Sequence, residues 1–515
     1  METRDVVGYE IVISSFCDSN GDGIGDLNGV CSKLMYLKDL GVNVIWLSPF
    51  HESPLVDSGY DVSDYYSVDS RYGTMEDLRN LVNHAHELGI SVIMDLVLNH
   101  TSNQNEWFKK SVLKEDGYED FYIWSKTPNN WISFLGESVW TYVEERKEYY
   151  LHIFTKEQPD LNYTNPMVVK TMQEVANFYL KLGIDGFRLD AVAHLSKEMS
   201  FKDSAVCVKG WVDTKPFSNR DEVIQYLREW KRGLCKECLL IGEVGGEVSA
   251  ERSLEYLDHE ICGMDMVFTF DHCWLNGMYG HVVPTAKEDC TLIDSAMFVE
   301  NYLRYYERFK NKALPMLYWL NHDQPRLITQ YGSLVHREQS AKMLATLLYF
   351  LQGAMFLYYG EEIGMVNDRK TSIDEFVDVD AHNFFNSSKL SKKKKLHHLN
   401  RMNRDAARGK MDWESAIENE IWYEYQRIIH FRNEHKELIR TPNVEFRKSP
   451  RNVVEYIRKE KNEELHVIVN VSDVEIPFEQ CFFTNGEFIT GENWEGANLP
   501  PYYFGAYYTK KEQVS

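Results

Sequence analysis

The sequence is short of positive charge relative to negative charge. Its 515 residues include 56 Lys and Arg against 79 Asp and Glu, which gives a net charge of −23 at neutral pH. A surface of that sign repels polyanions at long range, and this excludes nucleic acid as a partner. An uncharged run at residues 343–359 is interrupted by Gln352 and Gly353, so we expect a buried helix and then a buried strand, with no membrane span.

The sequence also lacks a complete cysteine zinc motif and the G-x-S-x-G turn of serine hydrolases. The nine Cys are irregularly spaced, Cys235 and Cys238 form a lone C-x-x-C, and no second pair completes a zinc site. No apolar leader precedes Val6, so we expect reduced thiols in a cytoplasmic protein. No Ser lies in a G-x-S-x-G turn, which argues against a serine-nucleophile hydrolase of that kind.

Apolar strands alternate with amphipathic helices through most of the chain. We expect eight strands with helices between most of them, the order typical of an α/β (β/α)8 TIM barrel. An open doubly wound sheet is the alternative that periodicity alone leaves open. The expected strands include residues 8–14, 42–48 and 91–100, and the later ones end near Asp190, Glu243, Phe270, Leu320 and Tyr358.

Long intervals divide the barrel into parts. We expect the first part of the barrel at residues 1–100, a small inserted domain at 101–165 after the third strand, and the second part of the barrel at 166–437. Residues 360–413 are expected to form an extended loop after the eighth strand. Alternating apolar segments with turns between them predict a C-terminal antiparallel β-sandwich at residues 438–515.

Polar residues gather at the predicted strand ends, where barrels carry their working groups. Strand alternation places Arg188 and Asp190 on one face, and a guanidinium there can hold the carboxylate ionised. Carboxylates without a metal cluster suit glycoside hydrolysis, and a retaining mechanism needs two of them about 5–5.5 Å apart. Asp190 and Glu243, on adjacent strands, are the natural pair. The full set at these ends is Asn99, His100, Arg188, Asp190, Glu243, His322 and Asp323.

Four segments carry a resemblance to a known family. DLVLNH at 95–100, GFRLDAV at 186–192, GEV at 242–244 and NHDQPR at 321–326 resemble, in order and spacing, the segments of glycoside hydrolase family 13, the alpha-amylase family. QPDLN at 158–162 resembles a further segment of its alpha-glucosidase and oligo-1,6-glucosidase branch. The resemblance implies that Asp190 is the nucleophile, Glu243 the acid and base, and Asp323 a third carboxylate that binds sugar hydroxyls. It also implies that His100, Arg188 and His322 line the subsite of the cleaved sugar.

The resemblance further implies how a substrate is bound. In GYD at 59–61, Tyr60 would stack under the terminal sugar and Asp61 would bind its far hydroxyls. RDAAR at 404–408 resembles the branch segment that supplies a partner Arg, so we expect an Asp61–Arg408 salt bridge that closes the non-reducing end and makes the enzyme exo-acting. Ala191 follows the nucleophile. In similar enzymes Val at that position accompanies α-1,6 cleavage and Ala or Thr accompanies α-1,4 cleavage.

Residues 18–26, DSNGDGIGD, are spaced like the first nine positions of a calcium-binding loop. Position twelve is Gly29 rather than Glu, so the segment is not an EF-hand, and an Asx-rich turn without metal is the alternative. Similar enzymes carry a structural ion at this place, so Ca²⁺ is the expected cofactor. The expected ligands are Asp18, Asn20, Asp22, the carbonyl of Ile24, and Asp26.

The expected activity is that of a retaining, exo-acting α-glucosidase that prefers α-1,4 to α-1,6 linkages in short gluco-oligosaccharides. A transglycosylase such as a trehalose synthase or sucrose isomerase would share every residue named above, and a trehalose-6-phosphate hydrolase is a further alternative. A catalytically inactive ancillary or glycan-binding relative would need no matched acid and nucleophile. The only expected partner is the oligosaccharide substrate.

Overall fold

The computed structural model describes residues 5–206, 212–245, 248–268, 293–310, 312–478, 486–491, 494 and 496–510. Its centre is a sheet of eight parallel strands in the order β11–β10–β9–β5–β2–β1–β13–β12. These strands are β1 (Val7–Ile11), β2 (Val44–Leu47), β5 (Ser91–Val97), β9 (Gly186–Asp190), β10 (Leu239–Glu243), β11 (Met266–Phe268), β12 (Met316–Leu317) and β13 (Ala354–Tyr358). Chain neighbours lie side by side and β13 pairs with β1, as in a (β/α)8 barrel and unlike a doubly wound sheet.

Side chains fill the inside of the barrel. The ring of Phe268 on β11 meets that of Tyr318, just after β12, edge to face at 4.6 Å between centroids, which brings the two ends of the sheet together. Gly8 is required on β1 because a Cβ there would lie 2.2 Å from the ring of Phe356. The interior cluster consists of Val6, Val44, Trp46, Ile93, Ile241, Met266, Phe268, Met316, Tyr318, Ala354 and Phe356. The predicted end of the sixth strand at Phe270 lies outside the described residues.

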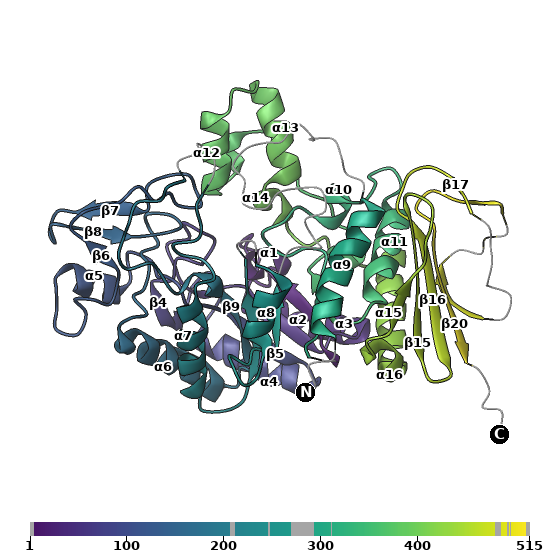
Figure 1. Ribbon diagram of the computed structural model, residues 1–515, viewed down its shortest axis with the longest axis horizontal. Helices are drawn as coiled ribbons and strands as arrows, with labels where there is room; N and C mark the ends of the chain where they lie inside the picture. Colours follow the sequence, from purple (N-terminus) through teal and green to yellow (C-terminus); the bar gives the residue numbers. More distant parts are fainter. Residues whose placement is uncertain are drawn as a thin grey trace.

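Helices surround the barrel (Figure 1). Helix α6 shows how they are delimited: Asn165 caps its first turn, Pro166 is its first residue, and Gly183 ends it at φ 119°. The short connection that follows places Gly186 at the start of β9. The main helices are α2 (Leu27–Ser32), α3 (Leu34–Leu40), α4 (Met75–Glu87), α6 (Pro166–Leu182), α7 (Asp221–Arg232), α8 (Ala250–Leu257), α9 (Ser295–Phe309), α11 (Arg337–Tyr349) and α15 (Glu420–Glu434).

A small unit follows β5, at the left of Figure 1. It contains helix α5 (Glu106–Val112) and an antiparallel sheet of β6 (Trp124–Ser125), β8 (Glu148–Leu151) and β7 (Trp140–Val143). A separate apolar cluster supports it, made of Ile123, Trp131, Val139, Trp140, Leu151, Ile153 and, from beyond β9, Phe217. Phe217 therefore ties this unit to the loop that follows the fourth barrel strand.

The segment after β13 is helical, so the expectation of an extended loop at residues 360–413 is wrong. It forms α12 (Val379–Ser387), α13 (Lys392–Met402) and α14 (Arg404–Ala407), with α12 and α13 projecting at the top of Figure 1. Phe376, Ala381, Phe384 and Leu399 form a small core between these helices. That core is too small to produce a strong pattern in a polar, Lys-rich stretch of sequence.

The C-terminal part is built from antiparallel strands. A sheet in the order β14–β15–β16–β20–β18 comprises Val444–Phe446, Val453–Glu460, Glu463–Asn470, Phe504–Lys510 and Glu487–Gly491. A pair formed by β17 (Ile476–Pro477) and β19 (Asn498–Leu499) contributes to a second apolar cluster with Trp494 and Tyr503. The Tyr456 hydroxyl donates to backbone carbonyls of α11, which fixes the sheet against the barrel. Among the described residues, no helix has both the length and the apolar character needed to cross a bilayer.

Candidate active site

Arg188 joins three carboxylates at the C-terminal end of the barrel. Its Nη1 lies 2.7 Å from Asp95 Oδ1 and 2.7 Å from Asp190 Oδ1, and its Nη2 lies 2.9 Å from Glu243 Oε1. These residues come from the adjacent strands β5, β9 and β10, and the register pairs Asp95 with Arg188. One guanidinium therefore fixes the relative positions of Asp190 and Glu243.

Exposure separates the groups that a substrate can reach from those behind them. The side chains of Asp190, Glu243 and Asp323 are 11%, 13% and 14% exposed, whereas Arg188 and Asp95 are fully buried. The three carboxylates can therefore contact a bound molecule. Arg188 lies behind Asp190 and Glu243, and Asp95 contacts Arg188, Trp46 and Tyr60.

The carboxyl groups of Asp190 and Glu243 share one electrostatic environment. Burial raises the pKa of Asp190 well above its ordinary value, Arg188 opposes this shift, and repulsion from Glu243 adds to it. Burial also raises the pKa of Glu243. Two buried carboxyl groups beside one guanidinium are expected to share a single proton. Arg188 bonds to both carboxyl groups, so it can hold one of them ionised while the other keeps the shared proton.

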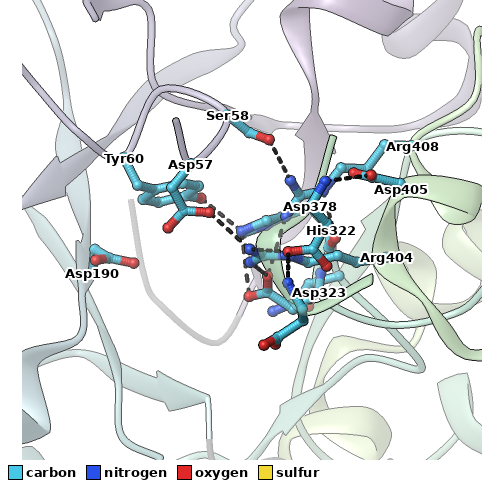
Figure 2. Close-up of polar contacts among 12 residues, drawn as sticks. Asp57, Ser58, Tyr60, Asp190, His322, Asp323, Asp378, Arg404, Asp405 and Arg408 are labelled. Atoms are coloured by element: carbon cyan, nitrogen blue, oxygen red, sulfur yellow. Dashed lines mark hydrogen bonds and ion pairs between the residues drawn. The ribbon is translucent and has the colours of Figure 1, made fainter. Parts of the chain in front are cut away.

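A second group of residues faces Asp190 from the other side of the barrel end (Figure 2). Asp323 Oδ1 accepts hydrogen bonds from Arg404 Nη1 at 3.0 Å and Arg408 Nη2 at 3.2 Å, and its Oδ2 lies 3.3 Å from His322 Nε2. The ring of Tyr60 stacks on that of His322 at 5.2 Å and 13°. Burial alone would raise the pKa of Asp323, but the imidazole of His322 and the two guanidinium groups outweigh it and hold that pKa below its ordinary value.

The structure corrects the expected Asp61–Arg408 pair. Asp61 is fully buried, and its carboxylate accepts from Ser53 Oγ and from the backbone N–H groups of residues 56 and 57, each at 3.0 Å. Arg408 instead donates to the His322 carbonyl at 2.8 Å, to Ser58 Oγ at 2.8 Å and to Asp323. Asp61 organises its own loop, because the donors of that loop enclose it.

The ion pair across the barrel end is made by Asp57 and Arg404. Arg404 Nη2 lies 2.7 Å from Asp57 Oδ1 and 3.1 Å from Asp378 Oδ1, as Figure 2 shows. Gln158 Nε2 lies 3.1 Å from both Asp57 Oδ2 and His100 Nε2. The small unit after β5 is therefore linked to α14 through Gln158, Asp57 and Arg404, and His100 belongs to this chain of contacts.

Ala191 adopts a left-handed backbone conformation, with φ 49° and ψ 31°. Its backbone N–H donates to Glu243 Oε2 at 3.0 Å. This bond links the residue after Asp190 directly to Glu243. Ala191 is 4% exposed and is therefore nearly buried.

Several residues of the site were not singled out from the sequence. Glu10 and Asp95 are charged residues inside otherwise apolar strands, which is a usable signal for a functional position. Lys197 is buried between Asp160 at 2.8 Å and Asn99 at 2.6 Å, and no local pattern marks it. Asp57 and Asp378 lie in polar segments where nothing distinguishes them from surface residues, and Arg404 begins the RDAAR segment in which Arg408 was the expected partner.

The loop at residues 18–26 has the oxygen donors of a calcium site. Asp18 accepts from the backbone N–H groups of residues 20, 21 and 23, and Asp26 accepts from Ser19 and Gly29. Such bonds turn carboxylates inward on a tight loop, and they leave further lone pairs for an ion. Within the described residues no three His, Cys, Asp or Glu side chains form a metal-binding group, so Asn20 and the Ile24 carbonyl would have to complete the set. The residue types suit Ca²⁺, and the bonds from backbone N–H groups to Asn20 and Asp22 equally suit the Asx-rich turn without metal.

Known proteins are similar to this chain in both sequence and fold. The model of the alpha-amylase catalytic domain matches residues 10–442. An oligo-1,6-glucosidase of Bacillus cereus is 36% identical, with 92% of each chain covered, and a trehalose-6-phosphate hydrolase of Bacillus subtilis (strain 168) is 33% identical over 92% of this chain and 90% of its own. Among solved structures, isomaltulose synthase from Erwinia rhapontici NX5 has a TM-score of 0.89 at 28% identity, with 99% of both chains covered. This protein therefore belongs to the alpha-amylase family, glycoside hydrolase family 13, and is a glycoside hydrolase.

Proposed function

We propose that the protein is a retaining, exo-acting α-glucosidase that hydrolyses short α-linked gluco-oligosaccharides. The observation that carries this proposal is the pair formed by Asp190 and Glu243, both held by Arg188. The names of the relatives, which include oligo-1,6-glucosidases, support a sugar substrate of this size.

The three carboxylates have different roles in the proposed reaction. Ionised Asp190 attacks the anomeric carbon while Glu243 gives its proton to the leaving glycosidic oxygen. Glu243 then takes a proton from water, which attacks the same carbon and releases Asp190, so the product keeps the α configuration. Asp323, which stays ionised, accepts hydrogen bonds from sugar hydroxyls and favours the distorted ring.

Two features support the finer specificity. The Asp57–Arg404 pair links the loop after β2 to α14 at the barrel end, and such a barrier favours attack at a chain end. Ala191 lies against Glu243 and is small, which leaves more room beside the leaving group than Val would. Crowding by two methyl groups is worth roughly 1–3 kcal/mol, so we propose a preference for α-1,4 over α-1,6 linkages.

Hydrolysis of a phosphorylated disaccharide and sugar transfer are the competing activities, and relatives carry both names. The two guanidinium groups nearest Asp323 already pair with carboxylates, which favours an uncharged sugar at that point. We also propose that residues 18–26 bind a structural Ca²⁺. Its role would be to fix the loop, because these residues contribute none of the three carboxylates.

A substrate screen with product analysis tests the proposal. Purified enzyme is incubated with maltose, isomaltose, trehalose, trehalose 6-phosphate and sucrose, and Asp190→Asn serves as the inactive control. We expect glucose from maltose at the highest rate, with α-glucose appearing first in time-resolved NMR. Fastest release from trehalose 6-phosphate, or an isomerised product from sucrose, would assign the competing activity instead.

A further inference from the structure

Glu10 is a buried carboxyl group behind the proposed sugar-binding residues. It lies in β1, and its Oε1 is 2.5 Å from His322 Nδ1. The two side chains are 3% and 4% exposed, so this pair acts on a bound sugar through Asp323, which His322 contacts and which is 14% exposed. The reaction of the three carboxylates described above does not use Glu10.

Charged and titratable groups surround this pair from several elements. The strand register places Glu10 level with Trp46 on β2 and Tyr358 on β13. The groups that act on Glu10 or His322 electrostatically are Asp95 on β5, Arg188 on β9, Asp323 after β12, Tyr358 on β13, and Arg404 and Arg408 at α14. The Glu10–His322 pair therefore lies between the charged groups around Arg188 and those around Asp323.

The partners of the other imidazole nitrogen fix its hydrogen. His322 Nε2 lies 2.7 Å from Tyr60 Oη and 3.3 Å from Asp323 Oδ2. The Tyr60 hydroxyl has one hydrogen, which it donates to Asp95 Oδ2 at 3.1 Å. Ionised Asp323 can only accept. Because a bare Nε2 would place its lone pair against the ionised Asp323 carboxylate, we assign the tautomer in which His322 Nε2 carries a hydrogen and donates it toward Tyr60 and Asp323.

A hydrogen on Nε2 determines what Nδ1 and Glu10 share. A second proton lies between them, either as Glu10 O–H donating to Nδ1 or as Nδ1–H donating to the carboxylate. Burial raises the pKa of Glu10 and lowers that of His322, so both groups are stabilised in their neutral forms with this proton on Glu10. If the proton is lost to solvent, the remaining hydrogen moves to Nδ1 and faces the Glu10 carboxylate. Nε2 then becomes a bare acceptor facing Asp323.

We propose that Glu10 is a positioning residue that holds the second proton of the Glu10–His322 pair and thereby keeps His322 Nε2 a donor on the sugar side. Loss of this proton at alkaline pH reverses the polarity of Nε2 and weakens substrate binding. The effect on binding rests on the proposed function. The shared proton itself does not.

The test compares Glu10→Gln with wild type. A Gln amide can still donate to Nδ1, but it has no proton to lose. The KM of the wild type for its best disaccharide is expected to rise at least tenfold at alkaline pH. Glu10→Gln should remove that rise in KM. The decrease of kcat at alkaline pH, which Glu243 sets, should remain in the variant. At neutral pH, KM of the variant should be about fivefold higher, because the neutral amide is the weaker donor. An unchanged alkaline rise in KM would overturn the proposal.

Glu362→Gln is the matched control. Glu362 is also a fully buried carboxyl group, and it accepts from Tyr9 and Tyr36 at 2.8 Å, away from His322. Its variant should keep the wild-type rise in KM. Proton NMR gives a readout that needs no activity: wild type should show a strongly downfield exchangeable resonance from the 2.5 Å bond, and Glu10→Gln should not. This resonance without hydrolysis of any α-glucoside would refute the proposed function alone, and its absence in wild type would refute the shared proton.

Discussion

Arg404 and Asp57 form an ion pair of 2.7 Å between residues 347 positions apart in the chain. The pair joins the loop after β2 to α14, and Asp378 and Asp323 share the same guanidinium. Arg404→Gln leaves these carboxylates without their common partner, so we expect KM for disaccharides to rise at least tenfold with a smaller change in kcat. Arg401→Lys, on the neighbouring α13, should leave KM unchanged. Steady-state kinetics of Asp57→Asn, Arg404→Gln and the double variant should give a coupling of about 1 kcal/mol or more, and strictly additive effects would contradict the role of the pair.

The two carboxylates held by Arg188 should respond differently to the leaving group. Asp190→Asn removes the proposed nucleophile, so kcat should fall about 10⁴-fold or more on every substrate. Glu243→Gln removes the proton donor, so maltose hydrolysis should fall similarly, while the first step with p-nitrophenyl α-glucoside should be far less affected because nitrophenolate leaves unprotonated. Pre-steady-state release of nitrophenol measures that step. Equal loss of this step in both variants would reject the assignment.

Ala191 gives a test of linkage preference. Ala191→Val adds two methyl groups beside Glu243, and we expect the isomaltose-to-maltose ratio of kcat/KM to rise about tenfold. Val is also strained at φ 49°, so a lower melting temperature should accompany the change. Ala191→Gly is the control, because it relieves the backbone and adds no bulk, and it should leave the ratio near that of wild type. If Ala191→Val does not change the isomaltose-to-maltose ratio of kcat/KM, Ala191 does not determine linkage specificity.

The loop at residues 18–26 predicts a stability effect of Ca²⁺. Ion binding to the native loop alone stabilises by mass action, so chelator should lower the melting temperature and added Ca²⁺ should restore it. Asp22→Asn should weaken this response, and Asp39→Asn, away from the loop, should not. Differential scanning fluorimetry with and without chelator measures the effect. Identical melting temperatures with and without chelator would indicate an Asx-rich turn that binds no metal.

Glu361 predicts how stability varies with pH. Its Oε1 accepts from the hydroxyls of Tyr349 and Tyr425 at 2.7 and 2.8 Å, and burial raises its pKa from 4.5 to about 7. Between these values the unfolded chain releases the proton before the native one does. This contribution to the free energy of unfolding is therefore complete below pH 4.5 and falls by about 1.4 kcal/mol per pH unit up to pH 7. Glu361→Gln should flatten that part of the profile in urea titrations, and an unchanged slope would show that Glu361 titrates normally.

The barrel and the carboxylates at its C-terminal end could be predicted from sequence because both follow from local rules. Strand alternation fixes that Arg188 and Asp190 share a face, and parallel neighbours bring Glu243 to the same end. Glu10 carried a usable signal, since a carboxyl group in a buried strand needs a partner. That partner, His322, is 312 residues away and could be identified only from the register of the folded sheet.

The pairing at the barrel end could not be predicted from sequence. Asp57 and Asp61 lie four residues apart in one polar loop, and the backbone decides which of them points outward. Leu55, Ser58 and Gly59 all have positive φ, at 59°, 52° and 103°, and this path turns the donors of the loop onto Asp61. The Asp57 carboxylate therefore remains available to pair with Arg404. Such choices depend on loop conformation, which side-chain chemistry alone does not specify.

The position of β1 between β2 and β13 constrains how this enzyme is made. A ribosome delivers β1 and β2 early, but the other edge of β1 has no partner until residues 354–358 have been synthesised. Until then an apolar strand edge stays open to pairing with other chains. Arg404 and Arg408, which both pair with Asp323, arrive later still, so the charged group at the barrel end is incomplete until residue 408 has been synthesised. Chaperone occupancy on stalled chains should therefore persist up to β13 and fall once that strand has emerged.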